Sequence, residues 1–150
     1  AEVERVELWV QVAVEAGAEL LCGGQRLSES CFPCTVLYDP PADSKVSQQE
    51  IFGPVICVYP YSHIDDAIAR ANALPFAFQA AVFTRNFDLA MRVYSRISAS
   101  AVMVNDHTAF RVDWMPFAGL RESGLGVGGV PHTMRDMRIE KMMVIRSAEL

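Results

Sequence analysis

The chain contains 150 residues, of which 51% are hydrophobic and 21% charged, so it is long enough to bury the core of one ordinary domain. Its formal net charge of -5, with Lys and Arg scattered along the sequence, argues against a nucleic-acid partner. The longest uncharged stretch, residues 71–84, is too short to span a bilayer, and no secretory signal opens the sequence. We therefore expect no membrane partner and a cytoplasmic location.

Residues 2–16 have the spacing of an amphipathic helix. Four small apolar residues fall on one face of it, namely Val3, Val6, Val10 and Ala13, and Gly17 follows as a helix stop. The sequence begins inside this predicted helix without an initiator Met. We therefore expect it to be a piece of a longer protein.

Short extended segments follow the first helix. Residues 19–22 predict a strand that runs into the turn at Gly23 and Gly24, and residues 34–38 predict a second strand. A brief helical turn is expected over residues 44–49.

From residue 55 onward, predicted strands alternate with predicted helices. The strands are expected at residues 55–59, 79–83 and 101–104, and the intervening helices at residues 64–71 and after Asn86, which is a favourable N-cap. This βαβαβ order predicts an α/β fold with an open, mainly parallel sheet and flanking helices. Because the loops beyond the carboxyl ends of such strands face a common cleft, residues 105–117 are expected at the active edge.

The four cysteines do not suggest a disulfide framework in a chain of this size and apolar content. Cys31 and Cys34 have the spacing of a redox or zinc motif, but no second Cys pair or His pair completes a metal site. We expect cytosolic thiols and no metal. A dithiol switch at Cys31 and Cys34 remains an open alternative without support from the sequence.

A possible site precedes the predicted strand at residue 55. Glu50 offers two acceptor oxygens, Phe52 offers a flat apolar face, and Gly53 and Pro54 turn the backbone sharply. The alternative is a plain turn that leads into a strand.

Several motifs together resemble the aldehyde dehydrogenase superfamily in order and spacing. They are Glu50-Ile51-Phe52-Gly53-Pro54-Val55, Pro75-Phe76, Ala81-Val82-Phe83-Thr84, Val104-Asn105, Pro116-Phe117 and Ser123-Gly124-Leu125-Gly126. The turn at residues 23–24 and the strand at residues 35–37 also match, so the resemblance covers nearly the whole chain. It covers only the last third of a typical family member.

The resemblance implies an enzyme that oxidises an aldehyde to an acid with NAD or NADP. Residues 1–137 are then the C-terminal portion of the catalytic domain, and residues 138–150 an oligomerisation strand and tail through which a homo-oligomer assembles. The family's nucleophilic Cys and general-base Glu are expected upstream, so no catalytic residue is assigned and the isolated chain is predicted to be inactive.

The resemblance also implies roles for individual residues. Glu50 matches the residue that accepts hydrogen bonds from the nicotinamide ribose, and Phe52 the residue beside the nicotinamide. Phe117 matches an aromatic residue that lines the substrate pocket. The structural alternatives are a surface carboxylate and two core aromatic rings.

The loop around Arg111 is similar to that of branches acting on small acidic aldehydes, such as lactaldehyde and phosphonoacetaldehyde dehydrogenases. A guanidinium there is suited to grip an anionic head group through two parallel hydrogen bonds. The alternative is an ordinary surface pair with Asp113.

Some positions depart from the resemblance. Ala77, Ala81, Ser100 and Ala118 stand where Gly is commoner, and each adds a Cβ that would be strained at positive φ. These departures leave a second hypothesis open, in which the chain is a catalytically silent remnant or an assembly module that keeps the fold.

Overall fold

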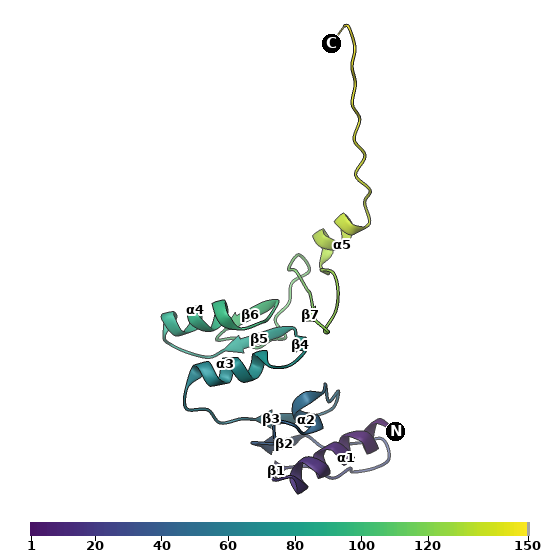
Figure 1. Cartoon of the computed structure of the whole chain (residues 1–150). Coiled ribbons are helices and arrows are strands. Elements are labelled where there is room, and N and C mark those ends of the chain that lie inside the picture. The colour runs from purple at the N-terminus through teal and green to yellow at the C-terminus, as the bar shows by residue number, and fades with distance from the viewer. Residues whose placement is uncertain (150) are drawn as a thin grey trace. The chain divides into compact units, whose positions relative to one another are not determined.

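The computed structural model describes residues 1–149 and divides the chain into two compact units (Figure 1). The first unit is Ala1–Ile64 and the second begins at Asp65. Each unit is a cluster of contacts of its own. Each unit is described by itself below.

The first unit is a three-stranded sheet with two helices. It contains α1 (Glu2–Glu15), β1 (Glu19–Cys22), β2 (Thr35–Tyr38), α2 (Lys45–Gln48) and β3 (Val55–Val58). β2 lies in the centre, antiparallel to β1 and parallel to β3. The helix predicted over residues 2–16, the turn at residues 44–49 and all three predicted strands are confirmed to within two residues.

The core of the first unit lies between α1 and the sheet. Val6, Val10 and Ala13 of α1 pack with Leu37 of β2 and Val46 of α2. Leu37 and Ala13 are fully buried. The predicted apolar face of α1 is therefore the face that forms the core.

The second unit combines three helices with two small sheets. It contains α3 (Ile64–Asn72), β4 (Phe76–Ala77), β5 (Gln79–Val82), α4 (Phe87–Arg96), β6 (Ala101–Val104), β7 (Leu120–Arg121) and α5 (Val130–Asp136). β5 and β6 pair in parallel, as strands joined by a crossover helix do, and β4 and β7 pair antiparallel.

Polar contacts join α3 to α4. Asp65 forms ion pairs with both Arg92 and Arg96. At the other end of α3, the side chain of Asn72 donates to the carbonyl of Arg96 at 2.8 Å and accepts from the amide of Ser98 at 2.7 Å. The two helices are thus held together at both ends of α3.

The β4–β7 pair is fixed to the same region by Arg121. Its guanidinium donates to the carbonyls of Asn72 and Leu74 at 2.8 and 2.6 Å, and to the Ser98 hydroxyl at 3.0 Å. Three contacts on one side chain hold β7 against the end of α3.

The mixed α/β class with parallel strand pairs and flanking helices is confirmed. The pairing differs in one respect, because within residues 1–149 the strands β3, β5 and β6 do not share one sheet. β3 is hydrogen-bonded to β2, and β5 to β6. The order of elements along a sequence predicts their type, but it does not specify which strands are neighbours.

The predicted N-cap of α4 is confirmed, since the side-chain oxygen of Asn86 accepts from the amide of Leu89 at 3.0 Å. We expect Asn86→Ala to lower the free energy of unfolding by about 1 kcal/mol, because the helix start loses an acceptor for one of its unpaired amides. Chemical denaturation measures this loss. Asn86→Asp, which keeps the acceptor, should stay near wild type, and an equal loss in both variants would contradict the capping role.

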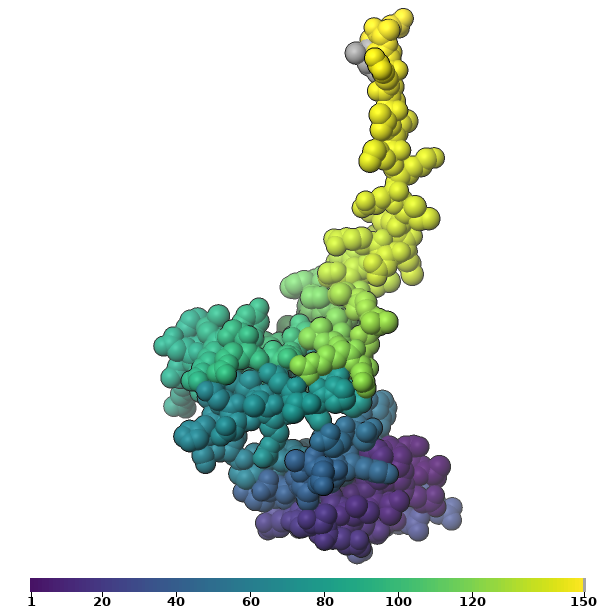
Figure 2. Space-filling view, in the orientation of Figure 1, coloured from purple at the N-terminus to yellow at the C-terminus, as the bar shows by residue number. Residues whose placement is uncertain are grey.

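The chain after α5 forms neither helix nor strand as far as residue 149. Its apolar side chains are strongly exposed, with Ile139 at 95% and Met142 at 85%. Figure 2 shows the segment as a narrow column of atoms that leaves α5. Residues 138–146, part of the oligomerisation strand expected from the sequence, form no strand among the described residues. Residue 150 of the predicted tail lies outside the described residues.

Candidate functional site

The segment before β3 presents a carboxylate and an aromatic ring to solvent. Phe52 is 82% exposed, and its backbone has φ 53°, a left-handed conformation that is unfavourable for a bulky residue. Glu50 is exposed two residues earlier. At this exposure the Phe52 ring contributes little to the packing of the unit. A strained backbone that presents an apolar ring to solvent is typical of a binding position.

Hydrogen bonds from residues of α1 and β2 fix the backbone of this segment. Arg5 donates to the carbonyl of Ile51 at 2.7 Å, and its guanidinium lies 4.5 Å from the ring centroid of Trp9. The amide of Thr35 donates to the carbonyl of Pro54 at 2.8 Å. The backbone on both sides of Phe52 is therefore fixed while the ring itself remains free.

In the second unit, Asn105 fixes the start of the loop that follows β6. Its side chain accepts from the amide of Thr84 at 2.7 Å and donates to the carbonyl of Thr84 at 2.9 Å. Asn105 itself has φ 57°, a conformation that Asn tolerates better than most residues. The loop thus leaves the carboxyl end of the β5–β6 pair in a defined direction.

Arg111 and Phe117 lie together at the end of this loop. The guanidinium carbon of Arg111 is 4.0 Å from the ring centroid of Phe117, a cation–π contact. Phe117 also contacts Phe78 in a T-shaped arrangement, with ring centroids 4.9 Å apart. Phe117 is 38% exposed, so it is a half-covered surface ring and not the core aromatic of the structural alternative.

The surface pair with Asp113 does not form. Within residues 1–149, Arg111 makes no ion pair and donates no hydrogen bond, and its stacking on Phe117 is its one recorded interaction. Its guanidinium donors are consequently available to a ligand. Stacking holds the planar group in place while its edge remains free.

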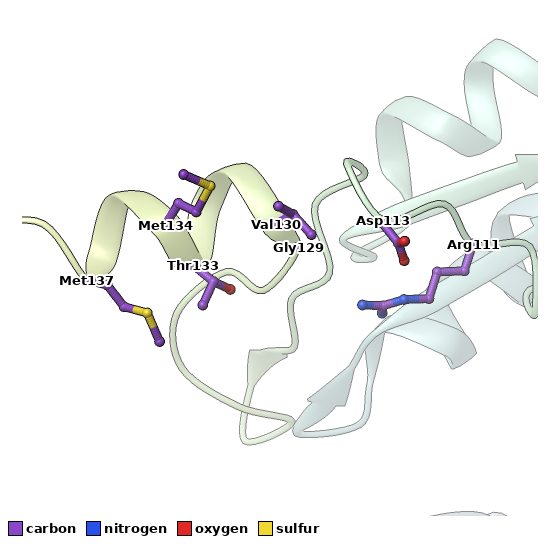
Figure 3. A pocket seen from close by; sticks show the side chains of 7 residues that line it. All are labelled: Arg111, Asp113, Gly129, Val130, Thr133, Met134 and Met137. Atoms are coloured by element: carbon purple, nitrogen blue, oxygen red, sulfur yellow. The ribbon is translucent and has the colours of Figure 1, made fainter.

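Arg111 borders an open groove of about 350 Å³ (Figure 3). Figure 3 shows the Arg111 side chain extending from the loop in the direction of α5, with Asp113 beside it on the same loop. The wall formed by α5 is largely apolar and consists of Val130, Met134 and Met137. The groove therefore combines a free cation, a carboxylate and a hydroxyl with an apolar wall.

The position of α5 relative to the loop depends on a close backbone approach. Gly129 has φ 107°, and a Cβ there would lie 2.5 Å from the carbonyl oxygen of Met115. The next amide, that of Val130, donates to the carbonyl of Asp113 at 2.8 Å. Only glycine permits this contact, which brings the start of α5 against the loop.

The predicted site residues divide between the two units. Glu50 and Phe52 share one exposed segment of the first unit, and Arg111 and Phe117 are in contact in the second. The sequence did not lead us to predict α5, and Thr133, Met134 and Met137 were therefore not among the predicted site residues. The available signal was Pro131 in the first helical turn after Gly129.

The substituted glycine positions carry no backbone strain. Ala77, Ala81, Ser100 and Ala118 all lie outside the set of residues with positive φ, so the expected strain at these positions is not found. Ala77 also receives a specific contact, because its amide donates to the Ser123 hydroxyl at 3.0 Å. The alanines therefore fit the backbone as it stands.

The thiols are free, and three of them, Cys22, Cys31 and Cys34, are exposed. Among residues 1–149 no three His, Cys, Asp or Glu side chains are grouped to hold a metal ion. None of the helices described is long and apolar enough to cross a membrane.

Cys57 differs from the other thiols because it is half-buried against the core of the first unit. Burial raises the pKa of this thiol, and a hydrogen bond with Tyr59 opposes the rise. We expect alkylation of Cys57 by iodoacetamide to require a higher pH than alkylation of the same thiol in the unfolded chain, because the thiolate is the reactive form. A pH–rate profile measured by mass spectrometry tests this, and identical inflections in folded and denatured chains would contradict it.

The sequence and the fold both have known relatives. The sequence profile of the aldehyde dehydrogenase family matches residues 1–143 of this chain. A 3-sulfolactaldehyde dehydrogenase from Priestia megaterium is 38% identical over 144 residues, which are 96% of this chain and 30% of that protein.

Solved structures agree with this match. Aldehyde dehydrogenase 21 from Physcomitrella patens, in complex with the reaction product succinate, aligns with a TM-score of 0.87 and 34% identity over 91% of this chain and 28% of its own. Glyceraldehyde-3-phosphate dehydrogenase from Methanocaldococcus jannaschii, complexed with NADP, aligns with a TM-score of 0.84 and 32% identity over 91% of this chain and 29% of its own. The chain thus spans somewhat under a third of the length of these relatives, and it belongs to the aldehyde dehydrogenase family.

Proposed function

We propose that these residues are part of an NAD(P)-dependent dehydrogenase that oxidises a small acidic aldehyde to a carboxylic acid. The observation that carries the substrate class is the Arg111 guanidinium, which stacks on Phe117 and has no partner for its donors within residues 1–149. The three relatives named above act on or bind anionic compounds, a sulfonate, a phosphate ester and a dicarboxylate. Together these findings favour an anionic substrate over a neutral one.

Arg111 would anchor the anionic end of such a substrate. A guanidinium presents two parallel N–H groups that match two oxygens of a carboxylate, sulfonate or phosphate. The apolar side chains of Met134 and Met137 border the same groove and offer apolar contact to the rest of the substrate. Binding the head group in one orientation fixes the direction of the aldehyde carbon.

Glu50 and Phe52 fit a nicotinamide coenzyme. The exposed carboxylate has both oxygens available to ribose hydroxyls, and the exposed ring of Phe52 is fixed at its backbone, so it offers a flat apolar face at low entropic cost. When bound, NAD(P) supplies the hydride acceptor. The role of these two residues is to hold and orient the coenzyme.

The nucleophilic Cys and the general-base Glu are expected from sequence that precedes residue 1. We therefore infer that the 150-residue chain has no dehydrogenase activity by itself. The test is an absorbance assay of reduced coenzyme with anionic aldehydes, applied to the full-length enzyme and to this chain. Oxidation by the full-length enzyme supports the proposal, whereas turnover by the isolated chain, or none by the full-length enzyme, overturns it.

Glu50→Gln in the full-length enzyme should raise the KM for the coenzyme about tenfold, because a charged acceptor is replaced by a neutral amide. The KM for the aldehyde should stay within about twofold, since the carboxylate is assigned to the coenzyme alone. Steady-state kinetics with each substrate varied in turn separates the two constants. Glu29→Gln, at another exposed carboxylate of the first unit, is the matched control.

We further infer that residues 138–146 pair as a strand with another subunit, so that the enzyme is a homo-oligomer and residues 138–150 form its assembly segment. The strong exposure of Ile139 and Met142 and the absence of a strand partner within residues 138–149 support this inference. A catalytically silent assembly module would use the same segment, and the coenzyme assay separates the two functions.

The free thiols fit a reducing cytoplasm.

A further inference from the structure

Two exposed thiols of the first unit lie on one face of the β1–β2 pair. Cys22 of β1 is directly opposite Val36 of β2. Because alternate residues of an extended chain share a face, Cys34 falls on the same face as Val36 and is the diagonal neighbour of Cys22. Thr35 and Leu37 point to the other face and are buried.

The backbone brings Cys22 close to Cys34. The Sγ atom of Cys22 is 3.8 Å from the carbonyl oxygen of Cys34. The amide of Thr35 donates to Pro54 on the β3 side of β2. Since the N–H and C=O of one trans peptide point in opposite directions, this bond turns the Cys34 carbonyl toward β1.

The turn after β1 approaches the same peptide. Gly23 has φ 74°, and a Cβ there would lie 2.5 Å from the carbonyl oxygen of Cys34 and 2.9 Å from the Cα of Thr35. The chain at residues 22–23 is therefore in backbone contact with the start of β2. Together with the 3.8 Å approach of the Cys22 Sγ atom to the Cys34 carbonyl, this contact places the two thiols on neighbouring segments of backbone.

We propose that Cys22 and Cys34 are a redox modification site that closes to an intrachain disulfide in the presence of a disulfide oxidant such as oxidised glutathione. One thiol loses its proton and attacks the oxidant, which forms a mixed disulfide and releases one glutathione. The second thiol loses its proton and attacks the protein sulfur of that mixed disulfide, which releases the second glutathione. Two protein thiols are oxidised and one glutathione disulfide is reduced to two thiols.

The structure assigns a different pair from the one that the sequence spacing suggests. Cys31 belongs to a separate turn, in which its carbonyl accepts from the amides of Leu27 and Ser28 at 2.9 and 3.3 Å. Among the described residues Cys31 and Cys34 make no hydrogen bond with each other, whereas the Cys22 Sγ atom approaches the backbone carbonyl of Cys34. The closed bond would fasten the edge strand β1 to β2.

Peptide mapping tests the pairing on the 150-residue chain. The folded chain is treated with oxidised glutathione, alkylated without reduction and digested with trypsin, which cleaves after Arg26 and so separates Cys22 from Cys31 and Cys34. We expect peptides 6–26 and 27–45 to be joined by a disulfide. The joined species should persist in Cys31→Ser and be lost in Cys22→Ser and in Cys34→Ser.

The same oxidation in denaturant is the control. Without the fold, the short Cys31–Cys34 loop closes most readily, so the product should shift to a disulfide within peptide 27–45. That internal disulfide as the main product of the folded chain would overturn the proposal. Glutathione adducts on all three thiols without a joined species would overturn it as well.

Discussion

Arg111→Ala in the full-length enzyme should lower kcat/KM for an anionic aldehyde by about 10- to 100-fold and leave a neutral aldehyde of similar size within about threefold. The reason is the loss of a charge-assisted hydrogen bond to the head group, which contributes about 1.5–3 kcal/mol. A neutral aldehyde makes no such bond in either protein. Steady-state kinetics with the two aldehydes, compared as a ratio, gives the discrimination directly.

Two further variants make this result specific to the guanidinium. Arg111→Lys keeps the charge but loses the planar group that stacks on Phe117. Its ratio of kcat/KM for the anionic aldehyde to that for the neutral one should therefore fall between those of wild type and Arg111→Ala. Arg135→Ala removes an exposed arginine of α5 that does not line the groove, and it should behave as wild type. If Arg111→Ala lowered kcat/KM equally for the anionic and the neutral aldehyde, the anchor role would be contradicted.

Leu37→Ala should lower the free energy of unfolding by about 2–5 kcal/mol, the range measured for large-to-small changes in tight cores. Leu37 is fully buried in the central strand of the first unit, in one core cluster with residues of α1 and α2. Its removal costs the transfer energy of the side chain and leaves a cavity that the flanking strands cannot collapse. Denaturant titration measures the change.

The matched control is the same substitution at an exposed position. Leu27 is 71% exposed, so Leu27→Ala should change the free energy of unfolding by less than about 0.5 kcal/mol. Equal losses in the two variants would mean that Leu37 does not pack in a tight core.

The sequence predicted most of the helices and strands of this chain because their signals are local. The spacing of Val6, Val10 and Ala13 is enough to predict α1 and its buried face, and Asn86 marks the start of α4. The sequence was a poorer guide to which strands are neighbours. The pairing of β4 with β7, for example, joins two-residue segments that are more than forty residues apart. Elements of that length carry no periodic signal.

The site was predictable as a set of residues but not as a set of contacts. Motif spacing selected Arg111 and Phe117 separately, and their stacking depends on the fold of the intervening loop. The groove wall formed by α5 was missed because that helix has only seven residues, too few for a helical period to stand out in the sequence. The Cys22 contact with Cys34 depends on strand register, whereas the spacing of the cysteines points to Cys31.

The left-handed backbone of Phe52 has a consequence for evolution at this position. Glycine adopts such a φ without steric cost, so replacing Phe52 by glycine would relieve about 1 kcal/mol of strain while removing the ring. Selection for robustness alone would therefore favour losing the phenylalanine. In the proposed function, the strain at Phe52 is the energetic cost of presenting an aromatic ring to the coenzyme.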